Sequence, residues 1–192
     1  MIKIYYNRKS IRLKNYYYAQ NGMYFITICT HNREPILSKI SKIDDVGAGL
    51  VPALDEKNNI YKIELTHIGK IIENKIYNLE KNNPIIIDSY VIMPNHIHFI
   101  INFGKLQWNG NEKNDICLRA GTRPAPTIPN VVRDFKSKTT LEYIKFNKQI
   151  GQYKKLWQRS YYEHIIRNEE EYYRICEYVK NNPIHYVQNK LE

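Results

Sequence analysis

Two histidines, His96 and His98, lie two residues apart within an apolar, β-branched run that extends from residue 85 to residue 101. Side chains alternate between the two faces of a strand, so both imidazoles point to one face and Ile97 points to the other. Two imidazoles side by side on a strand are a suitable pair of metal ligands. Two ligands alone do not make a site, and a pair of structural histidines is the competing interpretation. For a catalytic metal site, the rest of the chain must supply a third ligand and a reactive side chain.

The charge of the chain indicates a polyanionic partner. The 192 residues, 43% of them hydrophobic, are enough for one globular domain that spans 1–192. The formal net charge is +10, and 17 tyrosines are present against 5 phenylalanines. Cations that bind phosphates, together with rings that stack on bases, are typical of proteins that bind single-stranded nucleic acid. A basic surface that is only solvated is the alternative.

The sequence predicts a cytoplasmic protein that does not enter a membrane. No run of 18 apolar residues is present, and the N-terminal residues lack the pattern of a secretory signal. The three cysteines, Cys29, Cys117 and Cys176, are far apart and form no C-x-x-C motif. They favour a reducing compartment and indicate neither a disulfide framework nor a structural zinc.

The hydrophobic pattern predicts elements in the order β-α-β-β-α-β-α, after a basic arm at 1–22 and with 31–58 mostly as loop. The predicted elements are a strand at 23–30, a helix at 65–79, strands at 85–93 and 96–102, a helix at 129–147, a strand at 156–166, and a helix that is capped by Asn168 and ends at Asn182-Pro183. This order predicts an α+β, ferredoxin-like fold. In that fold a four-stranded antiparallel sheet has helices on one face, and the two histidines lie near the start of a central strand.

Two predicted surface insertions, 44–58 and 104–128, contain peptides with related coding DNA. Residues 46–54 read VGAGLVPAL, and residues 119–127 read RAGTRPAPT. The reverse complement of the first set of codons, shifted by one base, is compatible with all nine residues of the second peptide if both arginines use AGR codons. The gene is therefore predicted to contain an inverted repeat of about 27 bases, although two Gly/Pro/Ala-rich loops can also match by coincidence. We assign these loops no catalytic role.

The last predicted helix offers Tyr178 and Asn182 one turn apart on the same helical face. The Asn182 carboxamide oxygen can complete a His-His-Asn site, and imidazole combined with a hard oxygen suits Mg²⁺ or Mn²⁺. Such a cation would polarise a phosphate that Tyr178 attacks. Tyr143 and Asn147 have the same spacing, but Tyr143 continues the apolar face of its own helix. Spacing alone leaves Tyr178 equally open to interpretation as a packing residue.

Several segments together resemble the REP-associated tyrosine transposases, which are single-tyrosine members of the HUH nuclease superfamily. The segments are Met93–His98, with its His-hydrophobic-His pattern, Trp157–Arg167, Glu177–Pro183, Arg8–Lys14 and Tyr24–Thr30. The resemblance covers most of the chain outside the two insertions, and the combination of motifs is specific where H-x-H alone is not. The insertions depart from the family pattern, and one of them directly follows the histidine strand.

The resemblance implies a ferredoxin-like fold and an enzyme of DNA transposition that cleaves single-stranded DNA beside palindromic hairpin repeats. It implies that His96, His98 and Asn182 bind Mg²⁺ or Mn²⁺, and that Tyr178 forms a 5′-phosphotyrosine, which a 3′ hydroxyl can attack to rejoin strands. Three basic residues are weaker candidates for contacts with backbone phosphates: Arg12, Arg159 and Arg167. The protein is expected to be a monomer or a homodimer.

Two other functions are consistent with parts of the sequence. A non-catalytic nucleic-acid-binding module on a ferredoxin-like sheet would use the same charge and aromatic residues, but the aromatic pattern of sheet-surface RNA binders is not evident on the strands at 23–30 and 96–102. A hydrolytic metalloenzyme would explain the histidines and leave Tyr178 without a role.

Overall fold

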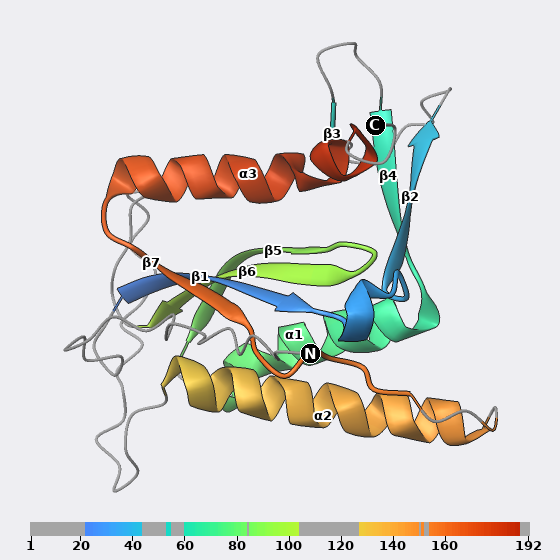
Figure 1. Ribbon diagram of the computed structural model, residues 1–192. Helices are drawn as coiled ribbons and strands as arrows, with labels where there is room; N and C mark the ends of the chain where they lie inside the picture. Colours follow the sequence, from blue (N-terminus) through green and yellow to red (C-terminus); the bar gives the residue numbers. More distant parts are fainter. Residues whose placement is uncertain are drawn as a thin grey trace, which may run out of the picture.

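A four-stranded antiparallel sheet forms the centre of the molecule (Figure 1). The computed structural model describes residues 22–43, 53–54, 60–83, 85–103, 127–149, 151 and 154–188. The sheet has the order β5-β6-β1-β7 and consists of β1 (Gly22–Cys29), β5 (Ile86–Ile92), β6 (His96–Phe103) and β7 (Tyr162–Ile166). Helix α1 (His67–Asn82) precedes β5, and α2 (Ile128–Gln149) precedes β7. This topology confirms the predicted ferredoxin-like fold, with both histidines on a central strand.

One face of the sheet packs on α1 and α2 and holds the larger core. Alternation along β6 sends Ile97, Phe99 and Ile101 to this face, where the aromatic ring of Phe99 meets that of Phe135 from α2. Full burial of one such aliphatic or aromatic side chain stabilises the fold by about 1.5–3 kcal/mol. The same alternation leaves His96 and His98 on the opposite face.

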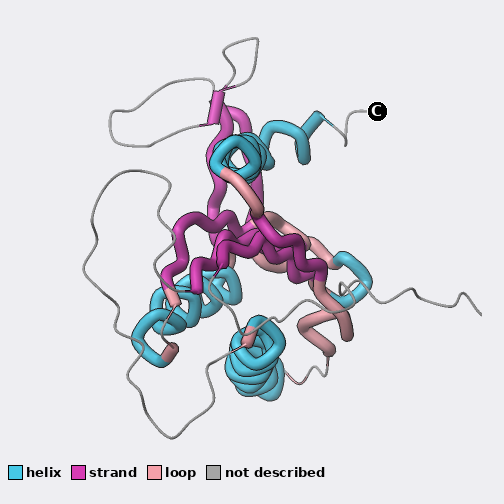
Figure 2. The backbone as a smooth tube through the Cα atoms, turned by 90° about the vertical axis from the view of Figure 1, so that its left-hand side faces the viewer, coloured by secondary structure: helices cyan, strands magenta, loops and turns pink. Residues whose placement is uncertain are grey.

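Helix α3 (Glu169–Gln188) covers that opposite face, as Figures 1 and 2 show. Its side chains Tyr172 and Val179 pack in a second core cluster against Phe25 and Ile100 of the sheet. The prediction that the helices share one face of the sheet therefore holds for α1 and α2, and α3 is an addition on the other face. The sheet separates two cores, and the histidines lie on the side that faces α3.

Two specific interactions fix the N-terminal part of α3. The predicted Asn168 cap is present, because its Oδ1 accepts a hydrogen bond from Glu171 N at 2.8 Å. Tyr172 donates a hydrogen bond to Asp88 on β5. The predicted end of the helix at Pro183 is wrong, because α3 continues to Gln188 with Pro183 inside it. Proline removes one backbone hydrogen bond and kinks a helix, and Figure 2 shows the last part of α3 running off at an angle.

A second, three-stranded sheet lies beside the end of α3 (Figure 1). It contains β2 (Ser38–Ile43), β3 (Ala53–Leu54) and β4 (Ile60–Leu65) in the order β2-β4-β3. The prediction that 31–58 is mostly loop was therefore wrong for β2, and β4 precedes the helix that was predicted from residue 65. The strand predicted to begin at 156 begins at Tyr162, with a single bridge between Thr30 and Trp157 before it.

Close packing joins α1 to the segment before β2. Thr66 caps α1 by accepting a hydrogen bond from Gly69 N at 3.1 Å. A Cβ added at Gly69 would lie 2.1 Å from the Leu37 carbonyl oxygen, so only glycine fits this contact.

The basic arm and the predicted insertions lie largely outside the described residues. Within the insertion predicted at 44–58, the structure describes Ala53–Leu54, which pairs with β4. The insertion at 104–128 falls between Phe103 and the first turn of α2. Among the described residues, no helix has the length and hydropathy needed to cross a lipid bilayer.

Candidate active site

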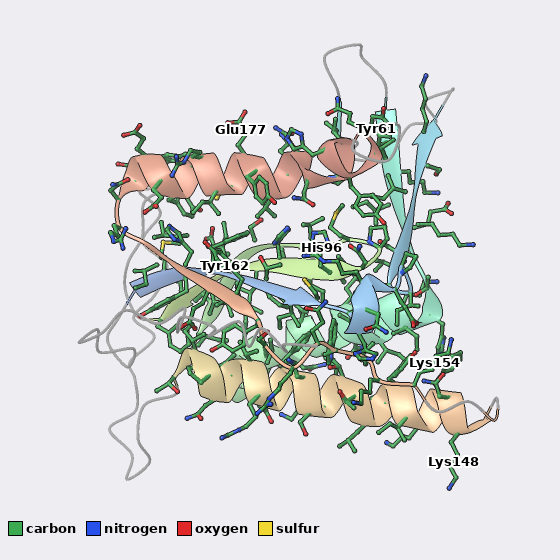
Figure 3. All side chains as sticks on the ribbon, viewed as in Figure 1. Tyr61, His96, Lys148, Lys154, Tyr162 and Glu177 are labelled. Atoms are coloured by element: carbon green, nitrogen blue, oxygen red, sulfur yellow. The ribbon has the colours of Figure 1, made fainter. Side chains whose placement is uncertain are left out.

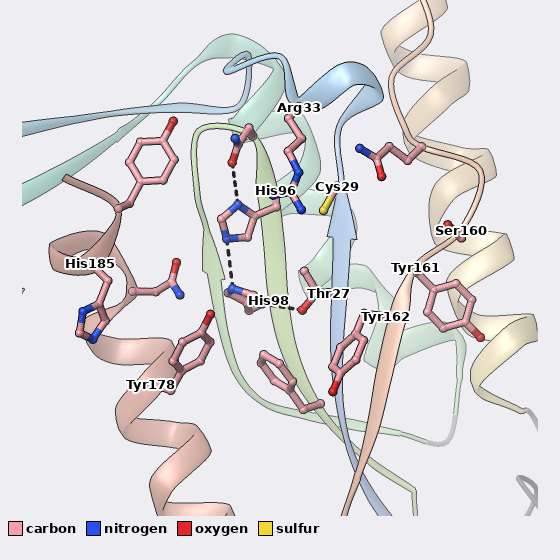
Figure 4. A pocket seen from close by; sticks show the side chains of 15 residues that line it. Thr27, Cys29, Arg33, His96, His98, Ser160, Tyr161, Tyr162, Tyr178 and His185 are labelled. Carbon is pink, nitrogen blue, oxygen red and sulfur yellow. Dashed lines mark hydrogen bonds between the residues drawn. The ribbon is translucent and has the colours of Figure 1, made fainter. Parts of the chain in front are cut away.

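A pocket of about 900 Å³ opens between the sheet and α3 (Figure 4). Its floor comes from β1 and β6, one wall comes from the segment that leads into β7, and the other wall comes from α3. Four of the predicted site residues line it: His96, His98, Tyr178 and Asn182. In Figure 3, His96 and Tyr162 lie between α3 and the sheet, whereas Glu177 on α3 points away from it. One chain therefore brings the predicted metal ligands and the predicted nucleophile into the same pocket.

The two histidine rings turn their Nε2 atoms toward each other at a distance of 3.1 Å. The Nδ1 atom of His96 donates to Asn95 Oδ1 at 2.7 Å, so its Nε2 carries a lone pair. The Nδ1 atom of His98 lies 2.8 Å from Thr27 Oγ1, and a hydroxyl can either donate or accept there. If His98 carries its proton on Nε2, it donates a hydrogen bond to Nε2 of His96. If it carries the proton on Nδ1, both Nε2 atoms are free to bind a cation.

Burial keeps both imidazoles neutral. Desolvation lowers the pKa of His96 from 6.5 to about 4; a hydrogen bond to the Asn182 side chain, which favours the protonated ring, opposes the change, and the charge of Arg33 adds to it. Desolvation, and then the nearby His96, lower the pKa of His98 to about 3. The neutral imidazole is the form that binds metals. Both rings therefore stay in the ligand form well below pH 6.

The donor set fits a hard divalent cation. Two ligand atoms in neighbouring octahedral positions with bonds of about 2.1 Å lie about 3 Å apart, which is close to the 3.1 Å between the two Nε2 atoms. In the part of the chain that the structure describes, no group of three His, Cys, Asp or Glu side chains could hold a metal ion. A third protein ligand at the histidine pair would then be another kind of donor, and the side chain of Asn182 is the candidate, because it is 6% exposed and hydrogen-bonded to His96.

Tyr178 combines contact with the histidines and access to solvent. Its ring meets that of His98 edge-on at 5.4 Å between centroids, and that of Phe25 at 6.0 Å. The residue is nevertheless 45% exposed. Asn182 follows one helical turn later on the same side of α3, and His185 extends that side of the pocket (Figure 4). The phenol is held by its ring beside the imidazoles and remains open to a large substrate.

The structure adds site residues that sequence reasoning missed. Thr27 is the register partner of His98 across β1 and β6, and this pairing brings its hydroxyl to the ring. Arg33 lines the pocket with a left-handed backbone, φ 54°, directly after Asn32 at φ 53°. Asn95 adjoins the histidine motif and was the one candidate that position alone could have suggested. Long-range register and unusual backbone conformation leave no local sequence pattern.

Of the three arginines predicted to contact DNA, the two in the described part of the chain, Arg159 and Arg167, are not among the pocket residues. Arg12 lies outside the described residues. Arg159 is exposed between Gln158 and Ser160, which do line the pocket. Arg167 is exposed beyond the far end of β7, where its backbone N–H donates to Glu171 at 2.8 Å. Within the described part of the chain, Arg33 is the arginine that the pocket contains.

Comparison with known proteins places this fold among those of transposases. An uncharacterised protein of Haemophilus influenzae is 36% identical over 191 residues, which cover 97% of this chain and 93% of the relative. The REP-associated tyrosine transposase of Escherichia coli is 23% identical over 168 residues, 88% of this chain and 70% of that protein. A solved structure of a REP-associated tyrosine transposase bound to a REP hairpin superposes with a TM-score of 0.53 and 19% identity, over 91% of this chain and 74% of that chain. No family model matches the sequence.

These comparisons define the chain as an α+β protein with the fold of a tyrosine transposase. It belongs to the same family as the Haemophilus influenzae protein. The resemblance to the REP-associated tyrosine transposases, first indicated by the motifs, is confirmed in sequence and in fold.

Proposed function

We propose that the chain is a metal-dependent endonuclease and strand transferase that acts on single-stranded DNA beside hairpins, with Tyr178 as nucleophile. The observation that carries this proposal is the position of Tyr178, whose exposed ring contacts His98 in the pocket where the two Nε2 atoms converge. A REP hairpin is the DNA bound by the structural neighbour, and the net charge of +10 suits a nucleic acid.

His96, His98 and Asn182 would hold Mg²⁺ or Mn²⁺. The cation would neutralise charge on the oxygens of the scissile phosphate. Thr27 and Asn95 would orient the two rings by hydrogen bonds to their Nδ1 atoms, as partners of metal-binding histidines usually do.

Tyr178 would carry the covalent step. Its Oη attacks phosphorus, so that a bond from Oη to phosphorus forms while the bond from phosphorus to the 3′ oxygen breaks. The phenol loses a proton and the departing 3′ oxygen gains one, which leaves a 5′-phosphotyrosine and a free 3′ hydroxyl. Attack of a 3′ hydroxyl on the phosphotyrosine reverses the step and joins strands without an external energy source.

Substitution of the nucleophile tests this function. Full-length protein is incubated with Mn²⁺ and hairpin-bearing single-stranded DNA, and the covalent adduct is measured on a denaturing gel. Tyr178→Phe removes only an exposed hydroxyl and is expected to abolish the adduct while it preserves the fold and DNA binding. Tyr173→Phe is the matched control, because Tyr173 lies on the same helix, is 50% exposed and does not line the pocket. Cleavage that survives Tyr178→Phe would instead assign a hydrolytic mechanism.

A further inference from the structure

The two peptides with related coding DNA specify one shared nucleotide sequence. Superposition of the codons of 46–54 on the reverse complement of the codons of 119–127 gives GTNGGNGCNGGYCTNGTNCCNGCYCT, where N is any base and Y is a pyrimidine. No position that one peptide fixes conflicts with the other. The two peptides are therefore compatible with two copies of this sequence in opposite orientations in the gene.

Each copy is itself palindromic. The eight bases from the second base of the Gly47 codon to the end of the Gly49 codon are complementary to the eight bases from the end of the Val51 codon to the start of the Leu54 codon. Wherever the codons fix both bases of a pair in these arms, the pair is G·C, and the undetermined positions are free to pair. One strand can thus fold into a stem of about eight base pairs with a loop of about five nucleotides. An unpaired GTNG remains at the 5′ foot of the stem.

The fold explains how the chain tolerates both copies. Ile43 and Ile60, at the described ends on either side of 44–59, are register partners that close the pairing of β2 with β4. The second connection leaves β6 at Phe103, seven residues from His96, which is about 23 Å along an extended strand. Long insertions in connections of this kind cost little stability. The first connection leaves the three-stranded sheet and the second leaves the four-stranded sheet, and Ile43, Ile60 and Phe103 at these points do not line the pocket.

We propose that this hairpin is the DNA that the pocket recognises, so that the gene carries two inverted copies of its own substrate. The inference rests on the proposed function and identifies its target. The unpaired foot of the hairpin is the single strand that can enter between the sheet and α3. The same pocket offers this strand the cation of Arg33, the exposed ring of Tyr162 and the phenol of Tyr178. The paired stem stays outside the pocket.

The nucleotide sequence of the gene gives the first test. The inverted repeat requires AGR codons at Arg119 and Arg123, and CTN codons at Leu50 and Leu54. A CGN codon at either arginine, or a TTR codon at either leucine, breaks the shared sequence and overturns the inference.

Adduct formation on defined oligonucleotides gives the second test. The single strand read from the gene is compared with a strand in which one arm is scrambled, a strand in which both arms are changed so that pairing is restored, and an unrelated hairpin. All are incubated with the full-length protein and Mn²⁺. We expect at least tenfold more Tyr178-dependent adduct, and at least tenfold tighter binding, on the gene's own hairpin than on the scrambled strand or the unrelated hairpin. The strand with restored pairing is expected to regain at least part of the adduct.

The outcomes separate this inference from the function on which it rests. Equal adduct on the unrelated hairpin supports the endonuclease and overturns the claim that the gene carries its own substrate. Equal adduct on the scrambled strand overturns recognition of the hairpin. Absence of adduct on every strand overturns the proposed function and this inference together.

Discussion

His96 and His98 turn their Nε2 atoms toward one another across 3.1 Å, while their Nδ1 atoms bind Asn95 and Thr27 on the outer sides. In each ring an oxygen contacts Nδ1, and Nε2 faces the space between the two rings. This arrangement is what a metal-binding pair requires, because the partner at Nδ1 sets both the tautomer and the orientation of the ring.

Removal of the Thr27 hydroxyl should weaken metal binding without unfolding the protein. Thr27→Val keeps the shape of the side chain but removes the acceptor for the Nδ1–H that the buried His98 carries when its Nε2 binds a cation. Loss of such a partner typically lowers metal affinity by about 10–100-fold. Thr27→Ser keeps the hydroxyl and should bind nearly as the wild type. Calorimetric titration with Mn²⁺ measures both, and wild-type affinity in Thr27→Val would remove the assigned role of this hydroxyl.

The stability of the metal-free protein should fall as the pH drops from about 6.5 toward 4. The pKa values of His96 and His98 are depressed in the folded state, to about 4 and about 3. In this range the unfolded chain binds protons that the folded chain does not, so the stabilisation is complete above 6.5 and is lost at lower pH. Each unit of pKa difference corresponds to about 1.4 kcal/mol.

Urea unfolding in the presence of a chelator, at pH values from 7.5 to 4.5, measures this loss. His98→Gln removes one titrating group, so its stability should depend less steeply on pH whatever its absolute value. An equal slope in the variant and the wild type would contradict the burial of a neutral His98.

Arg33 should contribute one phosphate contact in the pocket. Arg33→Ala is expected to weaken binding of single-stranded DNA. The slope of log affinity against log salt concentration is expected to become shallower by about one. Lys70→Ala is the matched control, because Lys70 is an exposed cation on α1, the helix that packs on the other face of the sheet. Fluorescence anisotropy at several salt concentrations measures both variants. If the two variants behave alike, the pocket does not use Arg33.

Gly69 should be irreplaceable for steric reasons. Gly69→Ala would place a methyl group 2.1 Å from the Leu37 carbonyl oxygen, and separating the backbones is expected to cost at least about 2 kcal/mol. Gly151→Ala is the comparison, because Gly151 has φ +69° but open space around its Cα. Gly151→Ala should lower the free energy of unfolding by about 1 kcal/mol, because alanine disfavours a left-handed backbone. Thermal unfolding ranks the two variants, and the reverse order would contradict the close approach of α1 to Leu37.

Local pattern was sufficient to predict the central sheet and part of the site. Alternation along β6 placed His96 and His98 on one face, and helical spacing placed Tyr178 one turn from Asn182. The motifs that resemble the transposases then distinguished Tyr178 from Tyr143, which lies on α2 and is buried in the core.

The remaining features depend on contacts between distant segments. Strand β2 forms only because it pairs with β4 across an intervening segment, and the pattern of β2 alone gives no sign of that pairing. Helix α3 passes Pro183 because Asn182, Pro183 and Ile184 are all buried, so packing outweighs the missing backbone hydrogen bond. The apolar stripe of α3 indicates that the helix packs, but it does not indicate which face of the sheet the helix covers.

Identification of the residue that becomes attached to DNA tests the central claim most directly. Tyr161, Tyr162 and Tyr186 line the same pocket as Tyr178, so the chain offers rival phenols. The covalent complex formed with Mn²⁺ and hairpin DNA would be digested, and the peptide that carries the nucleotide would be sequenced by mass spectrometry. The account predicts a 5′-phosphate ester on Tyr178 that does not form when the metal is chelated before the DNA is added. Attachment to any other residue, or strand cleavage with no attached nucleotide, would contradict it.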